Sequence, residues 1–151
     1  MDEVVSAILT ICKQLDVKSS ESFIEAVLNR LSGFGYEVTS DNINDQWTAA
    51  FCTQKVNQHI INTCNTPSVP DGMFYVAVDR VCGEFLYSLN NTGKLNLEDL
   101  DLDGAVTQIS EGDAIVSFES GTSQDEKFTA FVNYLQNEGI GDEICYRKLK
   151  W

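Results

Sequence analysis

The sequence predicts a mainly α-helical protein, a helical bundle built on a long antiparallel helix pair between Trp47 and Leu89. Apolar residues recur at helical spacing on both sides of a break at residues 65–72. Within the break, Pro67 and Pro70 lack amide donors and disfavour helix in the residue before them, so neither helix continues through it. We expect helices joined by so short a link to lie antiparallel.

Two shorter amphipathic helices precede this pair. The first is expected from about Asp2 to Leu15, and the second starts at a Ser19 or Ser20 cap and ends near Gly33. The helix that contains Trp47 carries two apolar stripes, and we expect the stripe with Trp47 and Phe51 in the core rather than in a ligand pocket. The two stripes are Ile43, Trp47, Ala50, Phe51 and Ile61, and beside them Ala49, Cys52, Val56, Ile60 and Cys64. We expect the helix after the break to bury a face made of Phe74, Val78, Val81, Phe85 and Leu89.

The C-terminal part of the chain is less uniform. Residues 95–104 fit either a strand or a turn of helix, whereas residues 105–118 alternate as a small β-hairpin around the turn at 110–113. Ser123 and Glu126 form a capping box for a helix that ends at Gly139. The sequence therefore predicts a domain over residues 1–139 and an extended tail over residues 140–151.

Composition narrows the function classes. The chain has 151 residues and a formal net charge of −13, from 10 basic and 23 acidic residues. Such a charge argues against wrapping nucleic acid through its phosphates or binding an anionic membrane surface. The cysteine count is odd, at 5, no C-x-x-C occurs, and the acidic start lacks the basic region of a signal peptide. We therefore expect a reduced, cytosolic fold.

No catalytic or metal-binding pattern stands out, and we expect no enzyme, cofactor or metal. His59 is the only histidine, and neither a phosphate-binding glycine loop nor G-x-S-x-G occurs. The most simple interpretation of Asp79, Arg80 and Glu84 is a local ion-pair set on the exposed side of their helix.

A calcium loop is the alternative for the acidic run. Asp99, Asp101, Asp103 and the following glycine match the first half of such a loop. Its twelfth position needs a bidentate glutamate, but Ser110 stands there and Glu111 comes one residue late. A solvated acidic loop is the expected state.

The last eight residues differ from the acidic body. Arg147, Lys148 and Lys150 occur there without an acidic residue, among large apolar side chains. Tyrosine, tryptophan and arginine are enriched at binding hot spots, so this composition favours a partner-docking segment. Packing of the tail against its own helices is the alternative.

Three stretches together carry a resemblance. They are residues 56–86 with the Pro70-Asp-Gly break, the hairpin Val106-Thr-Gln-Ile-Ser-Glu-Gly-Asp-Ala-Ile-Val-Ser-Phe118, and the end Tyr146-Arg-Lys-Leu-Lys-Trp151. Their order and spacing resemble the head–tail connector, or adaptor, proteins of tailed bacteriophages and prophages. The resemblance covers residues 56–151, and residues 1–40 are not distinctive.

The resemblance implies a structural virion protein, assembled in the host bacterial cytoplasm and located in the virion neck. Its homo-oligomer would be a twelve-subunit ring between the portal protein and the tail terminator or next neck protein. DNA would pass through the ring channel without sequence-specific binding. The expected portal-binding residues are Ile144, Tyr146, Arg147, Lys148, Leu149, Lys150 and Trp151.

An acidic channel wall would let DNA slide without attracting its phosphates. The candidates for that wall are Glu98, Asp99, Asp101, Asp103, Glu111 and Asp113. Two functions of other kinds remain open: a small acidic cytosolic inhibitor or binding protein for a basic partner, and a calcium-binding module on Asp99, Asp101 and Asp103.

Overall fold

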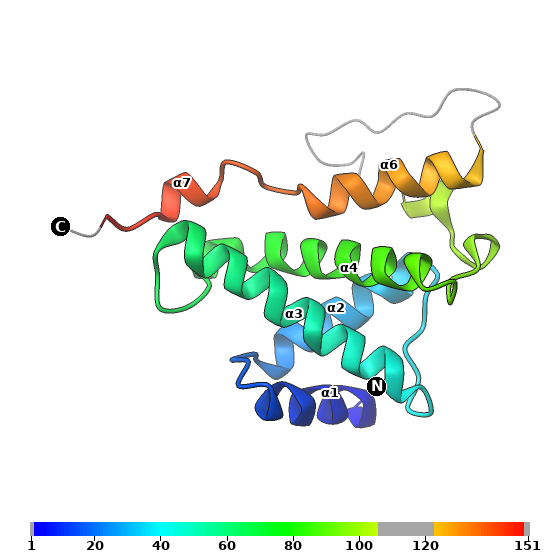
Figure 1. The fold of residues 1–151 in the computed structure, drawn as a ribbon, viewed down its shortest axis with the longest axis horizontal. Helices are drawn as coiled ribbons and strands as arrows, with labels where there is room; N and C mark the ends of the chain where they lie inside the picture. Colours follow the sequence, from blue (N-terminus) through cyan, green and yellow to red (C-terminus); the bar gives the residue numbers. More distant parts are fainter. Residues whose placement is uncertain (1, 106–122, 150–151) are drawn as a thin grey trace.

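The computed structural model describes residues 2–105 and 123–149, and within them the chain is mainly helical, as the sequence predicts. Helices α3 (Ile43–Cys64) and α4 (Phe74–Asn91) are the longest of the described elements. They run in opposing directions and cross one another (Figure 1). Residues 65–70 and the 3₁₀ turn η1 (Asp71–Met73) join them, so the predicted break stands where the prolines place it.

The remaining helices cover this pair from two sides. Helices α1 (Asp2–Gln14) and α2 (Glu21–Gly33) pack below it in the view of Figure 1, α1 on α3 and α2 on α4. Helix α6 (Gln124–Gln136) lies along the other side of α4. The short 3₁₀ turn η2 (Leu97–Asp99) contacts α6, and helix α7 (Glu143–Tyr146) contacts α3.

Side-chain caps set the helix starts that the sequence predicts. The Ser20 hydroxyl accepts the Phe23 amide at 3.1 Å, and the Ser123 hydroxyl accepts the Glu126 amide at 3.2 Å. Each cap satisfies an amide that the first helical turn leaves unpaired. At the C-terminal end of α3, Asn65 adopts the left-handed conformation with φ 54° and ends the helix.

Helix α4 is the centre of the core because it is covered on two sides. Phe85 is fully buried and meets the Tyr36 ring edge-on, with 5.5 Å between ring centroids. Phe34, just after α2, meets Phe131 of α6 in the same manner at 4.8 Å. Such edge-to-face contacts tie the elements on the two sides of α4 into one core.

One of the two predicted apolar stripes of α3 belongs to the core only in part. The stripe that begins at Ala49 is buried, but Ile43 is 62% exposed, Phe51 is 50% exposed and Trp47 is half-buried. The expectation of a core stripe was therefore wrong for Ile43 and Phe51, whereas Ala50 is fully buried and Trp47 packs against the core. The reason is that α1 and α4 pack on the Ala49 stripe and leave the side with Phe51 in solvent.

A further expectation falls almost entirely outside the described residues, and another needs correction. The predicted β-hairpin at 105–118 lies outside the described residues except for Ala105, which is buried and helical and is not in a strand. The predicted extended tail over 140–151 instead contains α7, and the backbone is extended only after Tyr146. Backbone bonds to the carbonyls of Gly141 and Asp142 form this turn of helix.

Candidate functional site

The segment that leads from α6 into the tail makes a close turn over α4. Gly139 and Gly141 both have positive φ, at 68° and 94°. A Cβ at residue 139 would lie 2.8 Å from a methyl carbon of Val76 on α4. Glycine therefore permits both the turn and the close approach, and residues 138–148 form what we call the tail root.

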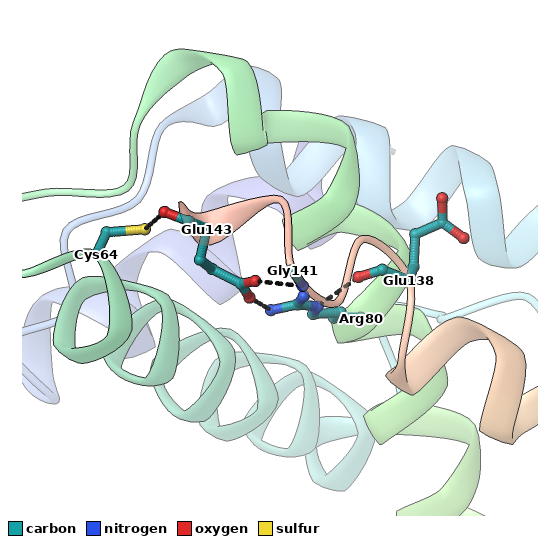
Figure 2. A network of polar contacts seen from close by, with 5 residues as sticks. All are labelled: Cys64, Arg80, Glu138, Gly141 and Glu143. Atoms are coloured by element: carbon teal, nitrogen blue, oxygen red, sulfur yellow. Dashed lines mark hydrogen bonds and ion pairs between the residues drawn. The ribbon is translucent and has the colours of Figure 1, made fainter. Parts of the chain in front are cut away.

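A buried ion pair holds the tail root on α4. The Arg80 Nη1 lies 2.6 Å from the Glu143 Oε1, and the Arg80 Nε–H donates to the Glu138 carbonyl at 2.8 Å (Figure 2). The Gly141 amide donates to the second Glu143 oxygen at 3.2 Å. Both charged side chains are almost fully buried. Removing either would leave the other as a buried charge without its partner.

The electrostatics of the pair favour the charged state. Burial alone raises the pKa of the Glu143 carboxyl, but the hydrogen bonds from Arg80 and from backbone amides outweigh it and leave the pKa below its ordinary value. The Arg80 Nη2 has no hydrogen-bond partner in the described part of the chain. The guanidinium is thus fixed through two of its three nitrogens.

A second set of contacts attaches the tail root to the end of α3. The Lys148 amide donates to the Cys64 carbonyl at 2.8 Å, and the Asn65 side-chain amide donates to the Lys148 carbonyl at 2.8 Å. The Cys64 thiol lies 3.8 Å from the Glu143 carbonyl oxygen (Figure 2). Tyr146 packs on the backbone of Gly72, where a Cβ would collide with its ring.

Most of the predicted docking residues that the structure describes have exposed side chains. Ile144 is 75% exposed and Leu149 is 65% exposed, although both adjoin anchored residues. Arg147 and Lys148 are also exposed, and Tyr146 is partly covered by Gly72. Lys150 and Trp151 lie outside the described residues. The described docking residues thus lie together near the C-terminal end of the chain in Figure 1, largely exposed but with the backbone of Lys148 held to the end of α3.

A cleft of about 590 Å³ borders the tail root between α3 and α4. Its floor contains Arg80 and Glu143, and the exposed Ile140 and Ile144 stand at its edge. His59 of α3 is exposed on the same wall and has no carboxylate bonded to it among the described contacts. The cleft is therefore part of the surface that the tail root presents.

The channel candidates that the structure describes lie at the opposite end of α4. Glu98, Asp99, Asp101 and Asp103 are exposed, and Glu111 and Asp113 fall outside the described residues. The Asp101 carboxylate accepts the Gly104 amide at 2.9 Å and so caps the helical stretch at 102–105. Among the described residues, no three His, Cys, Asp or Glu side chains form a group that could hold a metal ion.

Sequence reasoning misjudged the charged residues of α4. We expected Asp79, Arg80 and Glu84 to pair with one another, but each pairs with a residue of another element. Asp79 pairs with Arg30, Arg80 with Glu143, and Glu84 with Lys55. The position of Arg80 in the helix could have indicated its burial. Arg80 lies between Val78 and Val81, which are both buried, so its side chain is not on the exposed face of α4. The sequence alone does not say which distant carboxylate meets it.

Comparison with known proteins found no match to a family model, a curated protein or a solved structure. In the described part of the chain, no helix has both the length and the apolar character needed to cross a membrane.

Proposed function

We propose that this chain is a structural virion protein in the neck of a tailed phage or prophage. It forms an adaptor ring, of twelve subunits by the resemblance, between the portal and the tail or next neck protein. The observation that supports the proposal is the tail root. It is fixed by Arg80 and Glu143, and it presents exposed apolar and basic residues at one end of the domain.

Such an arrangement suits docking for two physical reasons. A segment whose base is already ordered loses less conformational freedom on binding than a free tail does. Exposed apolar side chains beside arginine and lysine offer both burial and charge to a partner, and here Ile144, Leu149 and Arg147 supply them. In a ring, the arms bind together, so a modest affinity per arm gives a firm joint.

The acidic end of the domain faces the channel in this proposal. Glu98 and Asp99 are exposed there, and the hairpin predicted at 105–118 with Glu111 and Asp113 would belong to the same wall. A negative wall does not attract phosphate, so DNA would pass without binding. A structure of the ring with a channel lined mainly by lysine and arginine would contradict this part of the proposal.

The test measures how well two single-residue variants are retained on immobilised portal. One variant replaces an exposed residue of the tail, and the other, a control, replaces an exposed residue elsewhere. Leu149→Ser removes an exposed apolar side chain without touching the bonds of Lys148 to α3. Tyr87→Ser is the matched control, since Tyr87 is also exposed and apolar but lies on α4 away from the tail root. We expect Leu149→Ser to reduce retention on immobilised portal at least about tenfold, as a docking anchor does, and Tyr87→Ser to have no such effect.

Images of the isolated protein with portal complete the test. We expect ring-shaped particles that stack on the portal ring. A chain that stays monomeric, does not bind portal, and binds basic proteins instead would support the acidic inhibitor function and overturn the proposal. Equal retention of both serine variants would show that the docking surface lies outside the tail.

A further inference from the structure

The tail root is attached to the rest of the domain at two places that differ in depth. The Arg80–Glu143 ion pair lies inside, where the two side chains are 5% and 7% exposed (Figure 2). Beyond it, residues 146–149 lie at the surface and contact the end of α3 and the link between α3 and α4. We call residues 146–149 the latch segment. Because only the first attachment is buried, the two can open separately.

The contacts of the latch segment reach both ends of the α3–α4 link at residues 65–73. At one end, the Lys148 amide donates to the Cys64 carbonyl and the Asn65 side-chain amide donates to the Lys148 carbonyl, each at 2.8 Å. At the other end, the Tyr146 hydroxyl lies over Gly72, at the place that a Cβ would take. The tyrosine and the lysine are therefore held by one short link, so the segment can close or open as a unit.

The latch contacts are weaker than the inner ion pair because they join neutral groups near solvent. Lys148 and Gly72 are exposed, and Tyr146 is 37% exposed. Opening the ion pair leaves a charge buried without its partner, which is costly, whereas water reaches the Lys148 backbone once the latch segment lifts. Segments with few buried contacts and solvent-accessible hydrogen bonds open first. We therefore expect the latch segment to open while Arg80 and Glu143 stay paired.

The closed latch covers groups that a docking partner needs. Tyr146 is one of the expected portal-binding residues, but part of its side chain is covered by Gly72. Interface anchors are enclosed by the partner in desolvated pockets, which the covered side of Tyr146 does not allow. The Lys148 backbone donor and acceptor are also both bonded to the end of α3, so they do not pair with a strand of the partner. Both restrictions end when the latch opens.

We propose that the latch segment is closed in the free subunit and opens when the tail docks, while the Arg80–Glu143 pair stays in place as the fixed base. This role rests on the proposed function, since the portal is the partner that selects the open state. The apparent dissociation constant then equals the intrinsic one divided by the open fraction. Loosening the latch therefore strengthens portal binding, whereas the loss of a binding contact weakens it. The sign of the change separates the two roles.

Two variants loosen the latch without changing a docking residue. Asn65→Gly removes the side-chain amide that holds the tail, and glycine adopts the φ of 54° that ends α3. Gly72→Ala puts a methyl group where the Tyr146 hydroxyl lies, and the outer part of that side chain has to move. Residue 72 lies in the 3₁₀ turn η1, which alanine adopts without strain. Asp16→Gly is the matched control, because Asp16 is the other described non-glycine residue with positive φ and lies in the α1–α2 link.

Hydrogen exchange tests the latch without portal. We expect each latch variant to speed the exchange of the Lys148 amide about threefold or more, the effect of losing one hydrogen bond. The Gly141 amide, which donates to Glu143 Oε2, should keep its wild-type rate because the inner pair stays closed. The control variant should change neither amide. Unchanged exchange at Lys148, or exchange at Gly141 that speeds by the same factor, would overturn a latch that opens separately.

Retention on immobilised portal tests what the latch does. We expect both latch variants to bind portal about threefold or more tightly than wild type, since the open fraction rises by the factor by which exchange speeds. The Asp16→Gly control should bind as wild type does, and all three variants should keep the wild-type circular dichroism. Equal or weaker binding by variants with faster Lys148 exchange would overturn the proposal, because the closed form would then be the one that docks. If neither wild type nor any variant binds portal, the proposed function is wrong, and with it the portal as the partner that opens the latch.

Discussion

Asp79 and Arg80 are neighbours on α4, yet their side chains pair with opposite sides of the molecule. Asp79 accepts from Arg30 of α2, with 2.9 Å between the Arg30 Nε and the Asp79 Oδ1. Arg80 pairs with Glu143 of the tail root at 2.6 Å. The first pair joins two helices of the core, and the second holds the tail root on α4, in addition to the bonds of Lys148 to the end of α3.

The pKa values of the two carboxylates are shifted in opposite directions. Burial raises the pKa of Asp79, and the single partner Arg30 does not restore it. Burial also acts to raise the pKa of Glu143, but Arg80 and backbone amides together bring it below the ordinary value. The number of hydrogen-bond donors around a buried carboxylate, more than burial itself, therefore decides the direction of the pKa change.

The largest expected effect comes from removing Arg80. Arg80→Ala leaves Glu143 buried without a counter-charge, and we expect it to lower the free energy of unfolding by about 3–5 kcal/mol. Arg30→Ala is the matched control, because the Arg30 side chain is 31% exposed and its loss of ion pair and ring contact should cost only about 1 kcal/mol. Denaturant unfolding at pH 7 measures both, and equal losses would show that the two pairs do not differ.

A smaller effect with a clear pH dependence is expected for Glu143→Gln. The pKa of Glu143 is lowered in the folded protein, so its charge stabilises the fold above the ordinary carboxyl pKa of 4.5 and this contribution is lost as the pH falls through the folded value. The stability difference between wild type and Glu143→Gln should therefore be full at pH 7 and shrink below pH 4.5. A difference that is the same at pH 7 and pH 3 would contradict the assignment.

The smallest effect is expected for Asp79→Asn, with the opposite sign. Because the pKa of Asp79 is raised in the folded protein, the protonated carboxyl stabilises the fold. This stabilisation is full below the ordinary pKa of 3.8 and is lost as the pH rises through the pKa of the folded state. Wild type should thus lose stability relative to Asp79→Asn between pH 3 and pH 6, and the two should differ by no more than about 1 kcal/mol at pH 7. The same unfolding series checks this, and a slope of the same sign as that for Glu143→Gln would remove the contrast.

The helices could be predicted from the sequence because their signals are local. The caps at Ser20 and Ser123, and the break with Pro67 and Pro70, act within a few residues of themselves. The exposed Phe51 could not be predicted, because an apolar stripe does not tell which of two faces a neighbouring helix will cover.

The tail root could be predicted only in part. Its exposed residues, such as Ile144, follow from composition, whereas the turn at Gly139 and Gly141 was not expected in a tail that was predicted to be extended. Their positive φ values instead direct the chain back over α4 to Arg80. That contact joins residues about 60 positions apart in sequence, a distance at which no local pattern operates.

Hydrogen exchange at the Lys148 amide tests most directly whether the Arg80–Glu143 pair holds the tail root. This amide donates to the Cys64 carbonyl and belongs to the predicted docking segment. We expect Glu143→Gln to speed its exchange at least about tenfold, while the amide of Phe131 in α6 keeps its wild-type protection, as local opening requires. Unchanged exchange at Lys148 in the variant would contradict the central role of the pair, because the root would then be held without it.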